Sequence, residues 1–379
     1  MLAHFSHHMV SALAVPLLPF IRDDFALDYT QSGFLISAFT LAYGISQLPG
    51  GWLADRIGPR ILITTGICGV ALAGFLVGLS HTYFMMMVFL VMMGVLGGGY
   101  HPSSPPLVSA SVEPRHRGRA LGLHMMGGSA SFFLAPLVAA AIAGAWGWRS
   151  SFIGLAIPTI AFGFLFYVLL GRRADKKAVD HRIADSHDKT SFTPSRLRPV
   201  VAFMTLSAFT SAILFSIVAF MPLFMVDHFG VSEKTGAALI SIIYSGGLWA
   251  SLLGGYLSDR LGKVPVMITA CFIAGPVVYM LTLAPYGLGT YTLLLIVGMF
   301  IYIRMPISEA YIIGHTPERH RSTILGIYYF GGMEGSGVLT PIIGSLIDHF
   351  GFYPSFTIIA AALVAVTLAC SVFLWGSKD

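Results

Sequence analysis

Residues 51–60 read Gly-Trp-Leu-Ala-Asp-Arg-Ile-Gly-Pro-Arg, and the pattern returns 204 positions later, at residues 255–262, as Gly-Tyr-Leu-Ser-Asp-Arg-Leu-Gly. Further matches keep the same offset: Arg115-His116-Arg117 with Arg319-His320-Arg321, Gly147 with Gly351, Phe152 with Phe356, and Pro102 with Pro306. The chain therefore consists of two homologous halves.

The composition is that of a polytopic membrane protein. Of the 379 residues, 56% are hydrophobic and only 10% are charged, whereas a typical soluble domain carries roughly 25% charged residues. The 42 glycines agree, because glycine is more frequent in transmembrane helices than in soluble ones. The three cysteines lie inside apolar runs. The composition excludes an ordinary globular domain, a disordered chain and a secreted disulfide scaffold.

Uncharged runs predict an all-α membrane protein with twelve transmembrane helices, since roughly 20 apolar residues cross the bilayer. The expected spans are 3–21, 29–54, 60–79, 83–110, 117–144, 149–170, 199–226, 235–257, 264–284, 288–314, 321–347 and 352–376. The polar stretch 172–198 divides them six and six. We therefore expect a six-helix bundle at 1–171, a cytoplasmic linker at 172–198 and a second bundle at 199–379, related by pseudosymmetry.

The basic residues predict the orientation. Eighteen of the 22 lysines and arginines fall on one side of the spans, three (Arg22, Arg149 and Lys234) fall on the other, and Arg304 lies inside a span. The positive-inside rule then places both termini and the linker in the cytoplasm of a cell or plasma membrane. This asymmetry explains the net charge of +5, so no nucleic-acid partner is expected. The first span has no basic residue before it, so we expect no cleaved signal peptide.

The stretch at 51–60 and its copy at 255–263 resemble the signature loops of the major facilitator superfamily. The resemblance covers the whole chain and implies two bundles, a cavity lined by spans 1, 4, 7 and 10, and alternating access. It also implies gating roles for the signature residues, Asp55, Arg56, Arg60, Asp259 and Arg260. We expect Asp55 and Arg56 to lie in a tight turn, with Gly51 and Gly58 permitting close approach and strained backbone. The alternative is that these loop residues only enforce the topology of the chain.

Two features bear on the branch of the family. The small-residue pattern of span five (Gly127, Ser131, Ala135-Pro136) is a weakened form of an exporter motif, and His101-Pro102 in span four is similar to the fosmidomycin-resistance branch. Drug exporters usually carry an arginine in span four, and residues 71–112 contain no arginine or lysine. These observations leave both uptake and efflux open.

Three charged residues inside the late spans are candidate functional groups, because each costs about 3 kcal/mol at mid-bilayer. Arg304 and Glu334 lie roughly 15–20 Å from the inner ends of their spans at 1.5 Å per residue. Arg304 is predicted to bind an anionic substrate and Glu334 to bind the coupling proton; a structural ion pair between them is the alternative. Glu309 is a second candidate for proton coupling or for a packing contact.

Histidines form the other candidate group. His4, His7 and His8 share one helical stripe of span one, and His101 lies beside Tyr100 in span four. Imidazole titrates near neutral pH and also binds metals. We assign His4 to proton coupling and His7, His8, Tyr100 and His101 to substrate binding. A transition-metal site and an interfacial N-terminal stripe remain as alternatives, and His124 is predicted to be a packed histidine.

The function that these features favour is secondary active transport of a small organic solute, possibly anionic, coupled to protons. The partners are then the solute, protons and the lipid bilayer, and the protein is expected to be a monomer. Drug efflux by proton antiport is the alternative. An intramembrane metal enzyme and a substrate sensor are less favoured, because the chain has neither a His-Glu-x-x-His pair nor a sizeable cytoplasmic domain. No Walker motif is present, so ATP hydrolysis is not expected. We predict that the protein is not an enzyme and has no cofactor and no metal.

Overall fold

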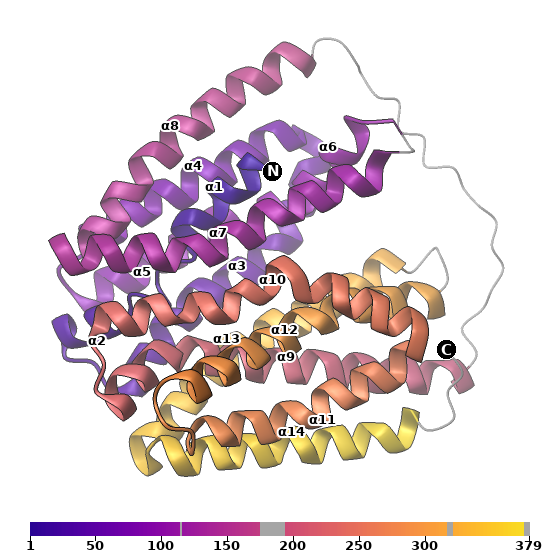
Figure 1. Ribbon diagram of the computed structural model, residues 1–379. Helices are drawn as coiled ribbons and strands as arrows, with labels where there is room; N and C mark the ends of the chain where they lie inside the picture. Colours follow the sequence, from indigo (N-terminus) through magenta and orange to yellow (C-terminus); the bar gives the residue numbers. More distant parts are fainter. Residues whose placement is uncertain (114–115, 175–193, 317–320, 375–379) are drawn as a thin grey trace. The chain divides into compact units, whose positions relative to one another are not determined.

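The protein is helical throughout the described residues, which are 1–113, 116–174, 194–316 and 321–374 of a computed structural model (Figure 1). For Asp55 and a few residues near helix ends only the backbone is described. The helices are α1 (Leu2–Ser11), α2 (Leu18–Phe25), α3 (Tyr29–Ile57), α4 (Pro59–Gly78), α5 (Tyr83–Gly97), α6 (Tyr100–Ala110), α7 (Arg117–Trp146), α8 (Trp148–Ala174), α9 (Pro194–Phe229), α10 (Glu233–Leu261), α11 (Lys263–Leu281), α12 (Leu288–His315), α13 (Arg321–Phe350) and α14 (Phe352–Leu374).

These helical segments correspond to twelve spans. Helices α1 and α2 together take the place of the first predicted span, and α5 and α6 take the place of the fourth. Within the described ranges, nine helices are long and apolar enough to cross a membrane by length and composition, with α5 and α6 counted as one. The all-α membrane fold is confirmed. The predicted linker, 172–198, falls largely outside the described residues, between the end of α8 and the start of α9.

The first span is not one continuous helix as the sequence predicted. Helix α1 ends at Ser11 and α2 begins at Leu18, with turns between them. Pro16 lies in this break and explains it, because proline has no N–H to donate and its ring clashes with the carbonyl four residues earlier. The break leaves α1 as a short helix whose His4, His7, His8 and Ser11 are all buried.

The fourth span is interrupted in the same way, at Gly98 and Gly99. Pro102 withdraws the N–H that would bond to the Gly98 carbonyl, and glycine adds little helical preference of its own. A Cβ atom on Gly98 would lie 1.9 Å from the Ser46 hydroxyl oxygen, so the break also brings α3 close. His101 consequently lies in the first turn of a new helix, α6.

The two halves repeat the same backbone at an offset of 204 residues. Three pairs of equivalent residues have positive φ angles. They are Ala26 (51°) and Gly230 (67°), Gly58 (89°) and Gly262 (89°), and Gly147 (83°) and Gly351 (75°). Each of these six residues lies where one helix ends and the chain turns into the next helix. Glycine adopts such angles without steric cost, which explains why five of these six positions are glycine.

Close helix contacts repeat as well. A Cβ atom on Gly94 would lie 2.6 Å from the Phe39 carbonyl oxygen, and one on Gly298 would lie 2.1 Å from the carbonyl oxygen of Ile243, which is the position equivalent to Phe39. Small residues at such crossings let helix backbones approach and pack in the absence of a hydrophobic driving force.

Residues cluster into two compact units. Unit 1 comprises Met1–Ile183 with Ala219–Ser241, and unit 2 comprises Ala184–Val218 with Ile242–Asp379. In unit 1, α1 packs against α4, α7 and α8, and α6 packs against α3, α4 and α7. In unit 2, α11 packs against α12 and α14, and α13 packs against α12 and α14.

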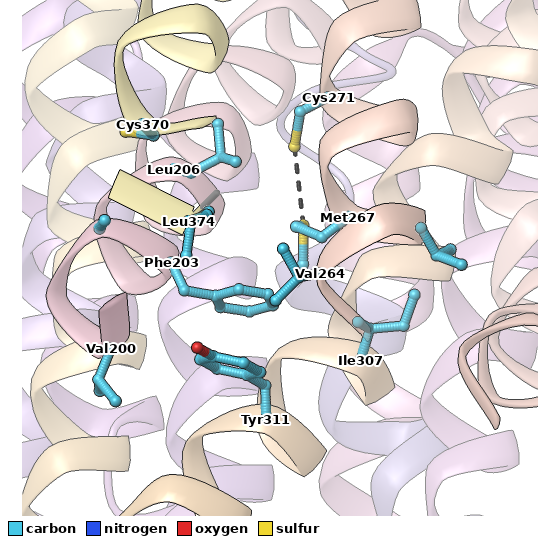
Figure 2. Close-up of a cluster of buried hydrophobic side chains, with 12 residues drawn as sticks. Val200, Phe203, Leu206, Val264, Met267, Cys271, Ile307, Tyr311, Cys370 and Leu374 are labelled. Carbon is cyan, nitrogen blue, oxygen red and sulfur yellow. Dashed lines mark hydrogen bonds between the residues drawn. The ribbon is translucent and has the colours of Figure 1, made fainter. Parts of the chain in front are cut away.

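An apolar core anchors unit 2. Phe203 of α9 stacks on Tyr311 of α12 with ring centroids 3.9 Å apart, and Ile307, Met267 and Cys271 surround them (Figure 2). Ile307 lies one turn along α12 from Arg304, so this core fixes the helix that carries the buried arginine.

Candidate functional site

Five histidines gather in unit 1, at the packing face of α1. We call His4, His7, His8, His101 and His124 the histidine cluster. The rings of His4 and His124 stack with centroids 4.3 Å apart, and the centroids of His8 and His101 lie 5.3 Å apart. His4, His7, His8 and His124 are buried, with at most 8% of each residue exposed.

Tyr100 belongs to the same region. It is fully buried, stacks on His7 with ring centroids 4.2 Å apart, and packs with Ala3, Ile63 and Ile67 in the core of unit 1. The histidines and the tyrosine that the sequence selected are therefore brought together. His124, which the sequence analysis treated as packing only, stacks at their edge.

Hydrogen bonds divide the cluster into two kinds of histidine. His7 uses both ring nitrogens: Nδ1 donates to the Gly66 carbonyl (3.0 Å), and Nε2 accepts from the Tyr43 hydroxyl (2.9 Å). His4 uses only Nδ1, which donates to the His124 carbonyl (2.9 Å). Because a carbonyl oxygen only accepts, Nδ1 carries the proton in the neutral form of both rings.

Arg304 is the corresponding feature of unit 2. It lies on α12 and is 1% exposed. Its Nε donates to the Phe300 carbonyl (2.9 Å) and its Nη1 to the Ser207 carbonyl of α9 (3.0 Å). The Ser207 hydroxyl in turn bonds to Ser308 (2.7 Å) and Tyr328 (2.9 Å), which joins α9, α12 and α13 around the arginine.

Arg304 has no carboxylate partner among the residues that the structure describes, and in that part of the chain no ion pair joins it to Glu334. The structural ion pair that the sequence left open is therefore not formed. A buried guanidinium that is not paired with a carboxylate of the described residues keeps most of its positive charge uncompensated, and such a charge is costly unless it is paired.

Glu334 lines a hollow in unit 2 of about 510 Å³, between α9 and α13. It is the only ionisable residue of the lining, which otherwise comprises Thr205, Ala208, Phe209, Ala212, Gly331, Gly335, Val338 and Leu339. Its Oε1 atom is buried and has no hydrogen-bond partner in the described part of the molecule. A carboxyl group in this setting is suited to gaining and losing a proton.

Glu309 lies away from that hollow. Its Oε1 accepts a hydrogen bond of 2.5 Å from the hydroxyl of Tyr329, which joins α12 to α13. The packing contact that the sequence offered as one interpretation of Glu309 is thus present.

Asp55 and Arg56 do not lie in a tight turn, contrary to the sequence-based expectation. Asp55 and Arg56 lie in the last turn of α3, and Asp259 and Arg260 lie in the last turn of α10. The helices continue until a positive φ at Gly58 or Gly262 ends them, whereas Gly51 is helical. A Cβ atom on Gly51 would meet only Pro102, at an ordinary 3.6 Å.

The arginines of the signature segments lie over aromatic rings. The Arg56 guanidinium lies 4.0 Å from the Trp52 ring centroid, and at the equivalent position Arg260 lies 4.6 Å from that of Tyr256. Arg60 stacks on Tyr167 (3.8 Å) and donates to its carbonyl. Asp259 is exposed, and the Asp55 side chain lies outside the described part.

A charged group in unit 1 was missed from the sequence. Arg22, at the end of α2, donates through both Nη atoms to Asp227 of α9, and the Tyr29 hydroxyl donates to the same carboxylate (2.6 Å). The repeat carried a signal for this group, because Asp227 is the equivalent of Asp23.

Asp23 and Asp24 are exposed, and they form ion pairs with Arg22 (2.9 Å) and Arg149 (2.8 Å), respectively. Glu233 lies close to Asp23, and its partial burial together with that negative charge raises the pKa of its carboxyl group.

Comparisons with known proteins agree with the fold. The chain is 24% identical to a probable L-galactonate transporter of Escherichia coli K12 (96% of this chain, 85% of the relative) and 22% identical to a hexuronate transporter of Bacillus subtilis 168 (93% and 87%). It is 25% identical to a phosphoglycerate transporter protein of Salmonella typhimurium LT2 (93% and 82%).

Solved structures share the architecture at low identity. A bacterial homologue of the human lysosomal transporter Spinster superposes with a TM-score of 0.80 at 16% identity, covering 98% of this chain and 94% of that one. A POT family transporter in complex with 5-aminolevulinic acid gives the same TM-score at 13% identity, with 98% and 94% coverage. The sequence profile of the Major Facilitator Superfamily matches residues 1–305 and 225–379. The chain therefore belongs to the Major Facilitator Superfamily.

Proposed function

We propose that this protein is a secondary active transporter of a small organic anion and that Arg304 recognises the negative charge of the solute. The observation that carries the proposal is a guanidinium, 1% exposed, that bonds to carbonyl oxygens and has no carboxylate partner within the described residues. A substrate carboxylate or phosphate would supply the missing negative charge.

The geometry of Arg304 suits this role. Nε and Nη1 are held by Phe300 and Ser207, and no oxygen of the described residues accepts a hydrogen bond from Nη2. Arginine binds carboxylates and phosphates through charge-assisted hydrogen bonds that are roughly twice as strong as neutral ones. The fixed stem and the unengaged end leave the guanidinium oriented before the anion arrives.

The relatives support the same substrate class. Several that match over nearly the whole chain are named as transporters of galactonate, hexuronate, sulfoacetate or phosphoglycerate, all of which are small organic anions. The efflux alternative has no comparable support from these names.

Coupling to protons forms part of the proposal, with Glu334 as the coupling group. Its buried, unpartnered oxygen in an otherwise uncharged hollow supports this assignment. His101 and Tyr100 are proposed to act on the solute from unit 1. Arg56, Arg60, Asp259 and Arg260, with Asp55, are proposed to act in gating on the cytoplasmic side. We further propose a monomer in the cell membrane with both termini in the cytoplasm.

Counterflow in proteoliposomes tests the anion assignment. Vesicles preloaded with galactonate, a hexuronate, sulfoacetate or phosphoglycerate should take up the matching labelled anion through the wild-type protein. Arg304→Ala should lower the rate at least about 100-fold, since losing a buried charge-assisted contact costs about 3 kcal/mol. Arg119→Ala is the matched control, because Arg119 is exposed at the start of α7.

Two results would overturn the assignment. One is undiminished anion counterflow through Arg304→Ala reconstituted in equal amount. The other is transport of cationic drugs, and of none of the anions, by the wild-type protein, which would favour efflux instead.

A further inference from the structure

The histidine cluster has a feature that anion recognition by Arg304 does not use. One ring nitrogen each from His4, His8 and His101 lies within 4.8 Å of the other two. His4 and His8 come from α1 and His101 from the first turn of α6, and His4 and His8 are 2% and 8% exposed. Three imidazoles from two helices therefore converge on one point inside unit 1.

Hydrogen bonds fix which nitrogen of each α1 ring is free. His4 Nδ1 donates to the His124 carbonyl, so Nε2 carries the lone pair. The Ser11 hydroxyl donates to the His7 carbonyl (3.2 Å), so its oxygen is left to accept from His8 Nδ1 (3.2 Å), and Nε2 of His8 also carries a lone pair. Histidines that bind metals almost always donate the other ring N–H in this manner, which orients the ring and fixes its tautomer.

The remaining histidines differ in whether a ring nitrogen is available to bind a metal. His7 has both nitrogens engaged and is not available as a ligand. His101 makes no hydrogen bond in the described part of the chain, so either of its nitrogens is free to bind. His4, His8 and His101 therefore each have an available lone pair, whereas His7 has none, and the His124 carbonyl holds the His4 ring in place.

We propose that His4, His8 and His101 form a binding site for a divalent transition-metal ion. Imidazole suits zinc, copper, iron and nickel. Open zinc sites have three protein ligands, and water or an anion occupies the fourth position. With metal–nitrogen distances of about 2.05 Å, tetrahedral ligands lie about 3.3 Å apart, so small ring rotations close the set from its present 4.8 Å.

The metal site does not depend on anion recognition by Arg304, because its three ligands lie in unit 1 and Arg304 lies in unit 2. Of the residues named in the transport proposal, it shares only His101. The three neutral imidazoles leave the charge of a divalent ion uncompensated. An anion from solution would therefore be favoured over water in the fourth position.

Cobalt(II) is a suitable probe, because its visible absorption reports the number and geometry of its ligands. The full-length protein, purified in detergent without a histidine tag, is titrated with CoCl₂ and then with ZnCl₂ as a competitor. We expect one Co²⁺ per chain with a four-coordinate spectrum that zinc abolishes. His101→Ala and His8→Ala should weaken binding more than about 100-fold, beyond the 10- to 100-fold that changes outside the ligand set cause.

Two further variants make the test specific. His81→Ala is the matched control, because His81 is exposed outside the cluster, and it should bind Co²⁺ like the wild type. Gly128→Ala keeps all three imidazoles but places a Cβ atom 2.8 Å from His4 Nε2. It should weaken binding about 10-fold, and it tests the site even where a ligand variant fails to fold. Absence of Co²⁺ binding at millimolar concentration, or unchanged binding in His101→Ala and Gly128→Ala, would overturn the proposal.

Discussion

The two halves place different chemistry on equivalent backbone positions. At an offset of 204 residues, Tyr100 of the first half corresponds to Arg304 of the second, His124 to Tyr328, and His4 to Ala208, whereas Ser104 and Ser308 are alike. Ser104 bonds to His124 (3.3 Å), and Ser308 joins Tyr328 through Ser207. Equivalent serine hydrogen bonds therefore support a set of imidazoles in unit 1 and a permanent cation in unit 2.

We propose that this difference separates two tasks. A guanidinium is always charged, so it recognises an anion at any pH, whereas an imidazole changes charge near neutrality or binds a metal through its lone pair. The repeat explains how both arise without a change of fold: the glycines that set the turns and helix crossings recur, and the side chains between them diverge. The experiments below test whether the two units carry these separate tasks.

The largest expected effect concerns Glu334, whose equivalent in the first half is Ala130. Glu334→Gln removes the titratable group of the hollow, so it should abolish accumulation of the anion driven by a proton gradient while exchange continues. Uptake and counterflow are measured on the same proteoliposomes. Gradient-driven accumulation that survives in Glu334→Gln would exclude this residue as the coupling group.

A smaller effect is expected for Tyr328, which occupies the place of His124. Tyr328→Phe deletes its hydrogen bond to Ser207, the residue whose carbonyl accepts from Arg304. Losing about 1 kcal/mol of support should raise the KM for the anion roughly fivefold and leave the maximal rate nearly unchanged. Tyr279→Phe is the control, since it removes a comparable bond to Tyr353 at an exposed position. An equal change in both variants would contradict a positioning role.

The smallest effect concerns Glu233 in the charged group of unit 1. Its raised pKa means that the folded protein binds this proton more tightly than the unfolded chain does. The stabilising contribution is complete below the unfolded value of about 4.3 and is lost as the pH rises through the folded value. Glu233→Gln should therefore raise the apparent Tm by about 1–2 °C at pH 7.5 and have little effect near pH 4. A Tm difference that is constant with pH would refute this.

Much of the fold could be predicted from the sequence, because span length and repeat depend on local composition. The signature segments, the offset of 204 residues and the apolar runs identify the family and the twelve spans. The breaks at Pro16 and at Gly98-Gly99 were missed, since an uncharged run does not reveal where a helix is interrupted. Asp55 and Arg56 were placed in a turn because the uncharged run ends at Ala54, whereas the helix continues to Ile57.

The site was predicted only in part. Charges inside apolar spans and a helical histidine stripe stand out in a sequence, so Arg304, Glu334 and the histidines could be selected as candidates. Which nitrogen of each histidine is free depends on partners such as the His124 carbonyl, 120 residues away, and no local pattern reveals such a bond. The pairing of Arg22 with Asp227 likewise joins residues 205 positions apart.

Anion binding to purified protein tests the central claim most directly. The anion that shows counterflow is titrated by calorimetry against wild type, Arg304→Lys and Arg304→Ala, with Co²⁺ binding followed in parallel on each. The account predicts weaker anion binding in Arg304→Lys, none in Arg304→Ala, and unchanged Co²⁺ binding in all three. Anion binding by Arg304→Ala as tight as that of the wild type would contradict it.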